Sequence, residues 1–244
     1  MAQEIWLQEK QLPMLQQLGT QFVAASGMEN SVSRSVMSGR PFGGVSIAWS
    51  PDLDCSISPI SNFRHKRIVG VELKGETDDF LLLCAYMPFF DSSNRAECMS
   101  ETIDALSMIE TIIDQFPSHA VIIGGDMNTE FKGSSPFDPL WSDLMAKYDL
   151  STCDHFLPST TTTYHHQSMD HRKWNDHFVV SRKVLSRSIL SNHEVLDEGD
   201  NVSDHLPITM RLTAQLQTMI SSPEAQRPRS KLRWDKLNNV SRLH

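Results

Sequence analysis

Two short segments, one central and one late, most constrain how this chain can fold. Residues 120–125 form an apolar run that ends at a Gly-Gly pair, and Asp126 and Asn128 follow it. An apolar run that stops at a small-residue turn is typical of a buried strand, which here would deliver a carboxylate and an amide to a sheet edge. Residues 203–208, Ser-Asp-His-Leu-Pro-Ile, present a carboxylate and an imidazole in the same way. Two such strand ends are the parts of a metal-assisted phosphodiester hydrolysis site.

The rest of the chain alternates short apolar runs with a few amphipathic stretches. Runs with strand character cover residues 4–8, 43–49, 68–74, 79–87, 120–125, 176–181 and 205–213. Residues 101–116 place apolar side chains at helical spacing before Pro117, and residues 138–148 predict a second helix that opens with Asp-Pro. Many strands with few helices between them predict an α/β fold in which two packed sheets are flanked by helices.

The charge of the chain is unevenly distributed. Residues 225–244 hold six Lys or Arg and one Asp, a net charge of +5, so a total of −8 leaves −13 on the first 224 residues. An acidic body that holds a metal ion is compatible with phosphate chemistry, because the ion neutralises what the carboxylates would repel. It does not predict a broad DNA-binding face, so we expect modest affinity for DNA.

Cysteine usage and hydropathy bear on the compartment. Cys55, Cys84, Cys98 and Cys153 show no Cys-x-x-Cys pairing, which favours reduced intracellular thiols over a metal site. No apolar run approaches membrane-spanning length, and the N-terminus lacks a basic and apolar signal segment. The sequence therefore predicts an intracellular protein without a membrane partner.

Five segments, in order, carry a family resemblance. They are Trp6-Leu7-Gln8-Glu9, Ala85-Tyr86-Met87-Pro88, Gly125-Asp126-Met127-Asn128, Trp174-Asn175-Asp176-His177-Phe178-Val179-Val180-Ser181 and Ser203-Asp204-His205. Together they resemble the endonuclease/exonuclease/phosphatase superfamily, the fold shared by DNase I and apurinic/apyrimidinic endonucleases. Residues 39–47 further resemble the endonuclease domains of LINE-type (non-LTR) retrotransposons. The match spans roughly residues 3–213, so we expect one domain over residues 1–213 and a basic linker or tail over residues 214–244.

The resemblance implies a DNase I-like, four-layer α/β sandwich of two mixed sheets flanked by helices. In the family, a first core strand ends in an Asn near the metal, and this sequence has no counterpart before residues 4–9. We therefore expect the domain to be truncated at its N-terminus, with the first strand missing. One side of the strand at residues 4–8 would then be either unpaired or paired with a segment not recognised in the sequence, and an exposed edge predicts weak activity and poor solubility.

Candidate metal ligands are carboxylates. Glu9 follows the strand-like run 4–8, and the resemblance implies that it and Asp204 face the metal. Hard oxygen ligands suit Mg²⁺, or Mn²⁺ in its place. The alternative for Glu9 is a solvated charge at a strand end. The pair His165-His166 has no further ligand at zinc spacing, so zinc is discounted.

The other candidate catalytic residues follow from the same segments. Asp126 would accept a proton from the attacking water or orient it, and Asn128 would donate hydrogen bonds to the phosphate; the alternative is an Asp-x-Asn turn that caps the backbone. The resemblance implies that His205 contacts the scissile phosphate, that Asp176 hydrogen-bonds His205 and favours its cationic form, and that Tyr86 offers its hydroxyl. His205 could instead be a packed core residue, and Tyr86 a half-buried strand aromatic.

Candidate DNA contacts lie in loops. Residues 160–174 form a polar, aromatic segment in which Tyr164 and Trp174 are predicted to stack on or wedge into DNA. Arg40 lies in a glycine-rich turn and is predicted to touch a backbone phosphate.

The leading hypothesis is a Mg²⁺-dependent endonuclease of retrotransposon origin that nicks DNA in the nucleus and leaves 3′-OH and 5′-phosphate ends. Two alternatives stay open. One is a phosphoesterase of the same superfamily that acts on a lipid, inositol phosphate or RNA; the other is a non-catalytic or weakly active remnant. The sequence leaves open the sequence or abasic-site preference, the oligomeric state and whether a polymerase domain follows.

Overall fold

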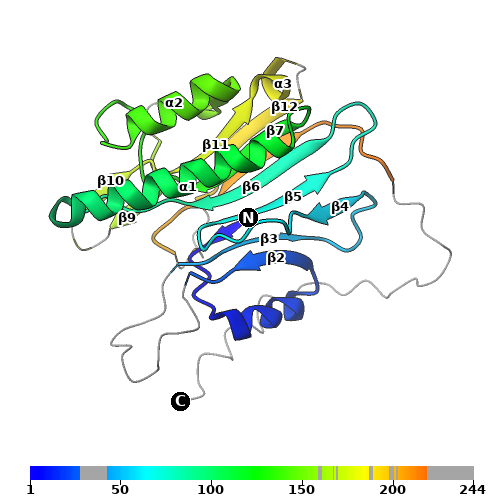
Figure 1. The fold of residues 1–244 in the computed structure, drawn as a ribbon, viewed down its shortest axis with the longest axis horizontal. Coiled ribbons are helices and arrows are strands. Elements are labelled where there is room, and N and C mark those ends of the chain that lie inside the picture. Colours follow the sequence, from blue (N-terminus) through cyan, green and yellow to red (C-terminus); the bar gives the residue numbers. More distant parts are fainter. Residues whose placement is uncertain are drawn as a thin grey trace.

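A six-stranded sheet forms the centre of the fold (Figure 1). The computed structural model describes residues 1–27, 43–158, 161–166, 168, 170–186, 189–197, 201 and 203–218. In order across the sheet, the strands are β4 (Ile57–Pro59), β5 (Ile68–Leu73), β6 (Phe80–Tyr86), β7 (Ala120–Asp126), β11 (Asp176–Ser181) and β8 (Leu150–Thr152). β6 and β7 are parallel and the other neighbours are antiparallel. The central strands are buried, which explains why their sequences are near-continuous apolar runs.

Helices cover one face of this sheet. α1 (Arg95–Gln115) and α2 (Asp138–Tyr148) pack through a cluster that joins Ile109, Ile112 and Trp141 to strand residues Leu83 and Ile123. α1 begins six residues before the predicted helix at 101–116, whereas α2 has the predicted bounds with proline in its first turn. Both predicted helices are confirmed, and they form one outer layer.

Two small sheets cover the other face. One has the order β1 (Ala2–Gln3), β3 (Val45–Trp49), β2 (Gln21–Ala25); the other pairs β12 (Leu190–Val195) with β13 (Ile208–Leu212). The 3₁₀ helix η1 (Glu9–Leu18) packs on β2 and starts a further layer. The predicted α/β sandwich of packed sheets flanked by helices is confirmed.

The N-terminal strand differs from the prediction. Residues 4–8 were predicted to be a strand, but the only strand there is β1, two residues long and ahead of that run. Glu4 and Trp6 both have φ of 51°, a left-handed backbone conformation that no continuous strand adopts. η1 then begins at Glu9, so the predicted strand was wrong.

The remaining elements are short and were not predicted. They are β9 (Tyr164–His166) paired with β10 (His171–Lys173), the helix α3 (Arg182–Ser186), and the 3₁₀ turns η2 (Ser92–Asn94) and η3 (Asp154–Phe156). β13 starts later than the predicted run 205–213, because Leu206 N donates to Thr163 O instead of continuing the pairing with β12.

The chain stays attached to the sheet beyond residue 213. Glu76 N donates to Gln215 O, and Gln217 N donates to Lys74 O. The division at residues 213/214 stays a prediction. Among the described residues, no helix is both long and apolar enough to cross a bilayer.

Candidate active site

β7 carries Asp126 to the end of the central sheet. Gly125, just before it, has φ of 149°, and a Cβ at this position would lie 1.9 Å from the carbonyl oxygen of Ala85 on β6. Only glycine therefore allows β7 to approach β6 this closely. The register that results places Asp126 opposite Tyr86, the last residue of β6.

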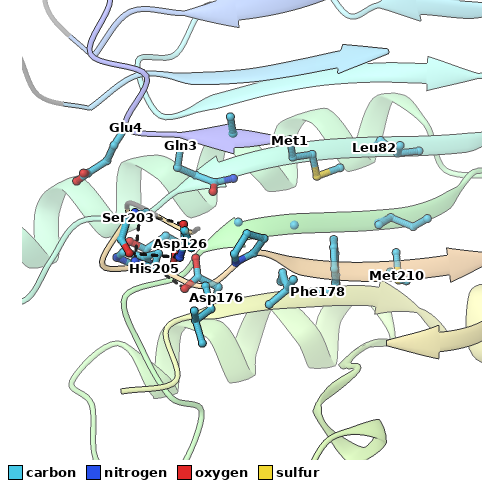
Figure 2. A pocket seen from close by; sticks show the side chains of 18 of the residues that line it. Met1, Gln3, Glu4, Leu82, Asp126, Asp176, Phe178, Ser203, His205 and Met210 are labelled. Atoms are coloured by element: carbon cyan, nitrogen blue, oxygen red, sulfur yellow. Dashed lines mark hydrogen bonds and ion pairs between the residues drawn. The ribbon is translucent and has the colours of Figure 1, made fainter. Parts of the chain in front are cut away.

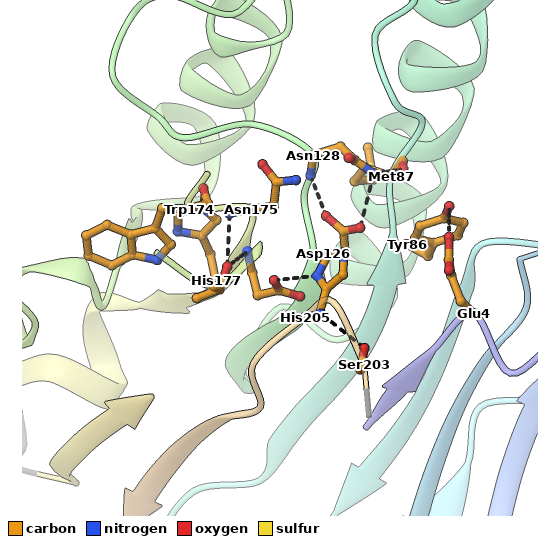
Figure 3. A network of polar contacts seen from close by, with 12 residues as sticks. Glu4, Tyr86, Met87, Asp126, Asn128, Trp174, Asn175, His177, Ser203 and His205 are labelled. Carbon is orange, nitrogen blue, oxygen red and sulfur yellow. Dashed lines mark hydrogen bonds and ion pairs between the residues drawn. The ribbon is translucent and has the colours of Figure 1, made fainter. Parts of the chain in front are cut away.

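The Asp126 side chain is buried and held by Asn128. Asn128 N donates to Asp126 Oδ1 at 2.9 Å, and Asn128 Nδ2 lies 3.2 Å from Oδ2 (Figure 3). The same amide nitrogen donates to Met87 O at 2.9 Å, which ties the turn to the end of β6. Asn128 has φ of 49°, a conformation that Asn tolerates well. The Asp-x-Asn segment is thus both a tight turn and a source of polar side chains at the sheet edge.

Asp176 and His205 meet beside Asp126. Asp176 is the first residue of β11 and lies opposite Asp126 in the antiparallel register. His205 Nδ1 donates to Asp176 Oδ2 at 2.8 Å, which is the predicted contact. This bond occupies Nδ1, so any further partner of the ring must bind Nε2. Thr163 Oγ1 accepts the backbone N–H of Asp176 at 3.0 Å and fixes the start of β11.

The charge of Asp176 raises the pKa of both His205 and Asp126. Burial alone lowers the pKa of His205, but the hydrogen bond and charge of Asp176 outweigh it and raise the pKa to about 9. Burial, and then the charge of Asp176, raise the pKa of Asp126 to about 8. Without a further cation, His205 is therefore protonated at neutral pH, and Asp126 largely retains its proton.

Tyr86 points to an unexpected carboxylate. Its hydroxyl donates to Glu4 Oε1 at 2.5 Å, and burial together with Glu4 raises the pKa of the Tyr86 phenol (Figure 3). Glu4 directly follows β1 and lines the same cavity as Asp126 and His205. Glu9, the predicted ligand, is exposed in the first turn of η1 and does not line this cavity. The structure therefore brings Glu4, and not Glu9, to the predicted site.

The acidic side chains and His205 line one cavity of about 520 Å³ (Figure 2). Its polar end is lined by Glu4, Asp126, Asp176, Asp204 and His205, and its other end is apolar. Four carboxylates and one imidazole thus face a shared space.

The predicted DNA contacts have different outcomes. The Tyr164 ring is half-buried, 4.9 Å from the His205 ring, so it lies at the site. Trp174 is only 4% exposed, and its ring stacks on the His177 ring with 5.7 Å between the ring centroids. The Trp174 ring is therefore part of the core and cannot stack on a base, which corrects the prediction. Arg40 lies outside the described residues.

Sequence reasoning missed a buried histidine that connects the segments of the site. His177 Nδ1 donates to Asp154 at 3.0 Å, and Nε2 lies 2.9 Å from the carbonyl oxygens of both Thr129 and Trp174. Both ring nitrogens face acceptors. His177 therefore links the turn after β7 to the start of β11; the only signal for it in the sequence was its position next to Asp176.

A second acidic group lies away from this site. Glu72, Asp79 and His119 hold ligand atoms within 4.8 Å of one another, the one such group among the residues described. Asp79 and His119 precede β6 and β7, whereas Tyr86 and Asp126 end those strands, so the group lies at the opposite end of the sheet. Lys74 Nζ already pairs with Glu72 at 2.5 Å and Asp79 at 2.9 Å. An ammonium group thus supplies the cation there.

The central sheet, the two smaller sheets on its one face and the polar cavity at the strand ends define a DNase I-like fold. A model of the Endonuclease/Exonuclease/phosphatase family matches residues 1–205. The chain belongs to this family, whose members are hydrolases that act on phosphodiester or phosphate esters.

Solved structures support the fold. The AP endonuclease LMAP from Leishmania major has a TM-score of 0.65 at 14% identity, covering 85% of this chain and 76% of that chain. The 3′ phosphatase NExo from Neisseria, bound to product DNA hairpin, has a TM-score of 0.60 at 16% identity, covering 86% and 87%. The endonuclease domain of TRAS1, a telomere-specific non-LTR retrotransposon, has a TM-score of 0.58 at 15% identity, covering 81% of each chain. A search of the curated proteins found no match.

Proposed function

We propose that this chain is a divalent-metal-dependent phosphodiesterase that nicks DNA and leaves 3′-hydroxyl and 5′-phosphate ends. The observation that carries the proposal is the coupled group of Asp126, Asp176 and His205, in which a buried carboxylate lies beside a cationic imidazole. Perturbed ionisation of this kind is concentrated at catalytic sites.

His205 and its neighbours bind the phosphate in this proposal. The Asp176 carboxylate holds the ring through Nδ1, so the Nε2 N–H is directed to a phosphate oxygen and stabilises charge as it develops. Asn128 and Tyr86 flank Asp126. When the phosphate binds, the Asn128 amide exchanges its bond to Asp126 Oδ2, and the Tyr86 hydroxyl its bond to Glu4, for hydrogen bonds to this phosphate.

Asp126 takes the proton of the attacking water. In the protein alone its pKa of about 8 leaves it largely protonated at pH 7, so added positive charge must lower this pKa before Asp126 can act as a base. The donor set fits a divalent ion: Glu4 and Asp204 are hard oxygen donors that line the cavity with Asp126. We assign the metal-holding role to Glu4 and Asp204, with Mg²⁺ or Mn²⁺ as the ion. A bound ion would stabilise negative charge on the phosphate and the leaving oxygen.

Two observations support DNA as the substrate: the similarity of the fold to that of nucleic-acid enzymes, and the position of Tyr164 in the site. The similar structures include a complex with product DNA and a retrotransposon endonuclease domain. Tyr164 lies half-buried beside His205, at a position where its ring can contact a nucleotide next to the scissile phosphate. We propose a retrotransposon origin, with DNA as the partner and the nucleus as the place of action.

Plasmid nicking tests the proposal. Supercoiled plasmid is incubated with the full chain in Mg²⁺, in Mn²⁺ and in EDTA, and the ends are tested for extension by a DNA polymerase, which requires a 3′-hydroxyl. A phosphoinositide, sphingomyelin and poly(A) RNA are assayed in parallel. We expect metal-dependent nicking with extendable ends and slower turnover of the other esters. If a lipid or RNA is hydrolysed faster than DNA, that ester and not DNA is the substrate. If no ester is hydrolysed, the domain is non-catalytic.

Two glutamates provide a matched pair for the metal assignment. Glu4→Gln removes a carboxylate from the cavity, whereas Glu9→Gln removes one from the exposed start of η1. We expect Glu4→Gln to lose most of the nicking activity and to need more Mg²⁺, with Glu9→Gln unchanged. The opposite result would restore Glu9 as the ligand.

A further inference from the structure

Asp176 and His205 come from two segments that belong to different sheets. Asp176 is the first residue of β11 in the central sheet, whereas His205 lies just before β13. β13 pairs with β12 in a separate two-stranded sheet, so the registers of the central sheet do not determine where His205 lies. The 2.8 Å hydrogen bond from His205 Nδ1 to Asp176 Oδ2 therefore depends on another connection between the two segments.

The hydroxyl of Thr163 holds the start of β11. β8 pairs with β11 only from Val179 to Ser181, so among the described strands none pairs with Asp176 on the side away from β7. The Thr163 hydroxyl takes the place of such a strand, because Oγ1 accepts the N–H of Asn175 at 3.1 Å and the N–H of Asp176 at 3.0 Å. A hydroxyl oxygen has two lone pairs, and both are used here. Thr163 is 0% exposed, so bulk water does not compete for these two N–H groups.

The backbone of the same segment holds His205. Leu206 N donates to Thr163 O at 2.7 Å, and His165 N donates to Asp204 O at 2.9 Å. The residue on each side of His205 is therefore hydrogen-bonded to the segment that begins with Thr163. Thr163 thus connects the two parts of the site: its hydroxyl bonds to the start of β11, and its carbonyl oxygen bonds to the His205 segment.

We propose that Thr163 is a positioning residue of the active site, which holds Asp176 through its hydroxyl and His205 through its backbone so that the carboxylate meets Nδ1 of the ring. The proposal rests on the function proposed above, in which Asp176 holds His205 so that Nε2 is directed to the phosphate. Thr163 is buried and acts through these two residues. A misplacement of about 1 Å at a catalytic group can slow a reaction by ~10²-fold, so a hydroxyl that fixes this pair affects the rate.

Three variants separate the hydroxyl of Thr163 from its bulk. Thr163→Val keeps a similar volume and removes the oxygen, so the N–H groups of Asn175 and Asp176 lose their acceptor. Thr163→Ser keeps the oxygen and removes only a methyl group. Thr102→Val is the matched control, because Thr102 is also 0% exposed and its hydroxyl donates to Cys98 O within α1, in the helical layer.

Two readouts are recorded on the full chain. In EDTA at neutral pH, proton NMR detects the Nδ1 proton of His205 as a low-field resonance, because this proton is held in a charge-assisted hydrogen bond to Asp176. The resonance is assigned by its absence from His205→Gln. In Mg²⁺, plasmid nicking gives kcat and the KM for DNA. Urea unfolding of each variant separates loss of the fold from loss of position.

We expect Thr163→Val to lose the low-field resonance and to lower kcat by ~10–10²-fold with little change in KM, and Thr163→Ser and Thr102→Val to keep both. If Thr163→Val does not fold, Thr163→Cys replaces it, because a thiol is only a weak acceptor. An unchanged resonance or an unchanged kcat in this variant, or equal losses in Thr163→Ser, overturns the proposal, as does absence of the resonance from the unaltered protein. If the unaltered protein does not nick DNA, the proposed function fails, and the resonance alone decides whether Thr163 positions the pair.

Discussion

The pairing of Asp176 with His205 makes a prediction that can be worked out from the structure. Asp176→Asn keeps the shape of the side chain and removes its charge. In the unaltered protein the pKa of His205 is raised from 6.5 to about 9 by the hydrogen bond and charge of Asp176, against the opposing effect of burial. With the charge removed, burial is opposed only by the weaker effects of Asp126 and Asp204, and we expect the pKa of His205 to fall well below 9.

The same shift sets a pH dependence of stability. A pKa that is higher in the folded than in the unfolded state stabilises the fold fully below pH 6.5, and this contribution is lost as pH rises toward 9. The change from 6.5 to about 9 corresponds to about 3 kcal/mol. The pKa of Asp126 is also raised, from its ordinary value of 3.8 to about 8. Its contribution to the stability of the fold is therefore lost in the same direction, as pH rises from 3.8 to 8. The two contributions overlap, so the His205 part is isolated in an Asp126→Asn background.

Two measurements check this reasoning in metal-free buffer. The His205 ring is titrated by NMR in the unaltered protein and in Asp176→Asn, and urea unfolding is measured from pH 6 to 9.5 in Asp126→Asn with and without Asp176→Asn. We expect the decline in unfolding free energy over this range to be largely absent when Asp176 is replaced. A His205 pKa that stays near 9 in Asp176→Asn would refute the assignment of the shift to this pair. In nicking assays, Asp176→Ala/His205→Ala should be little worse than His205→Ala, and multiplicative losses would mean that the two residues act separately.

Three further predictions follow from other contacts. Asp126→Asn should slow nicking by ~10²–10⁴-fold with an unchanged circular dichroism spectrum, and wild-type rates would exclude Asp126 as the base. Gly125→Ala should cost more unfolding free energy than Gly133→Ala, because both have positive φ but only Gly125 meets a backbone atom, Ala85 O at 1.9 Å; equal urea midpoints would contradict this. His177→Ala should lower stability by about 3 kcal/mol or more, since buried acceptors lose their donors, and a loss under 1 kcal/mol would mean that the histidine does not link the two segments.

The central sheet was predictable because burial on both faces leaves a strong local pattern. The runs at 68–74, 79–87, 120–125 and 176–181 correspond to strands β5, β6, β7 and β11 within one residue at each end. β12 was not predictable in the same way. Its sequence, Leu-Ser-Asn-His-Glu-Val, buries only two of six residues, and pairing with β13 determines its conformation.

The meeting of Asp126, Asp176 and His205 was expected from the family resemblance, but their geometry depends on pairings that no local pattern encodes. Asp176 lies opposite Asp126 because β11 pairs antiparallel with β7 in one register, and a shift by one residue would turn its side chain to the other face. His205 reaches Asp176 because its segment bridges to Tyr164. Trp174 shows that a local pattern does not tell whether a loop side chain is exposed. Its loop was predicted to face DNA, but the ring is buried beside His177.

The two glutamates show most clearly where local reasoning stops. The dipeptide Gln-Glu occurs twice in nine residues, ending at Glu4 and at Glu9, and the apolar residues between them favour a strand that ends at Glu9. The structure instead ends the strand at Gln3, through its pairing with Val45, and the left-handed turn that follows directs Glu4 to Tyr86, 82 residues away. The residue that we propose as a metal ligand is therefore positioned by long-range sheet pairing and not by the periodicity of its own segment. Of the two Gln-Glu copies in this chain, the one that ends a paired strand is the one that lines the cavity.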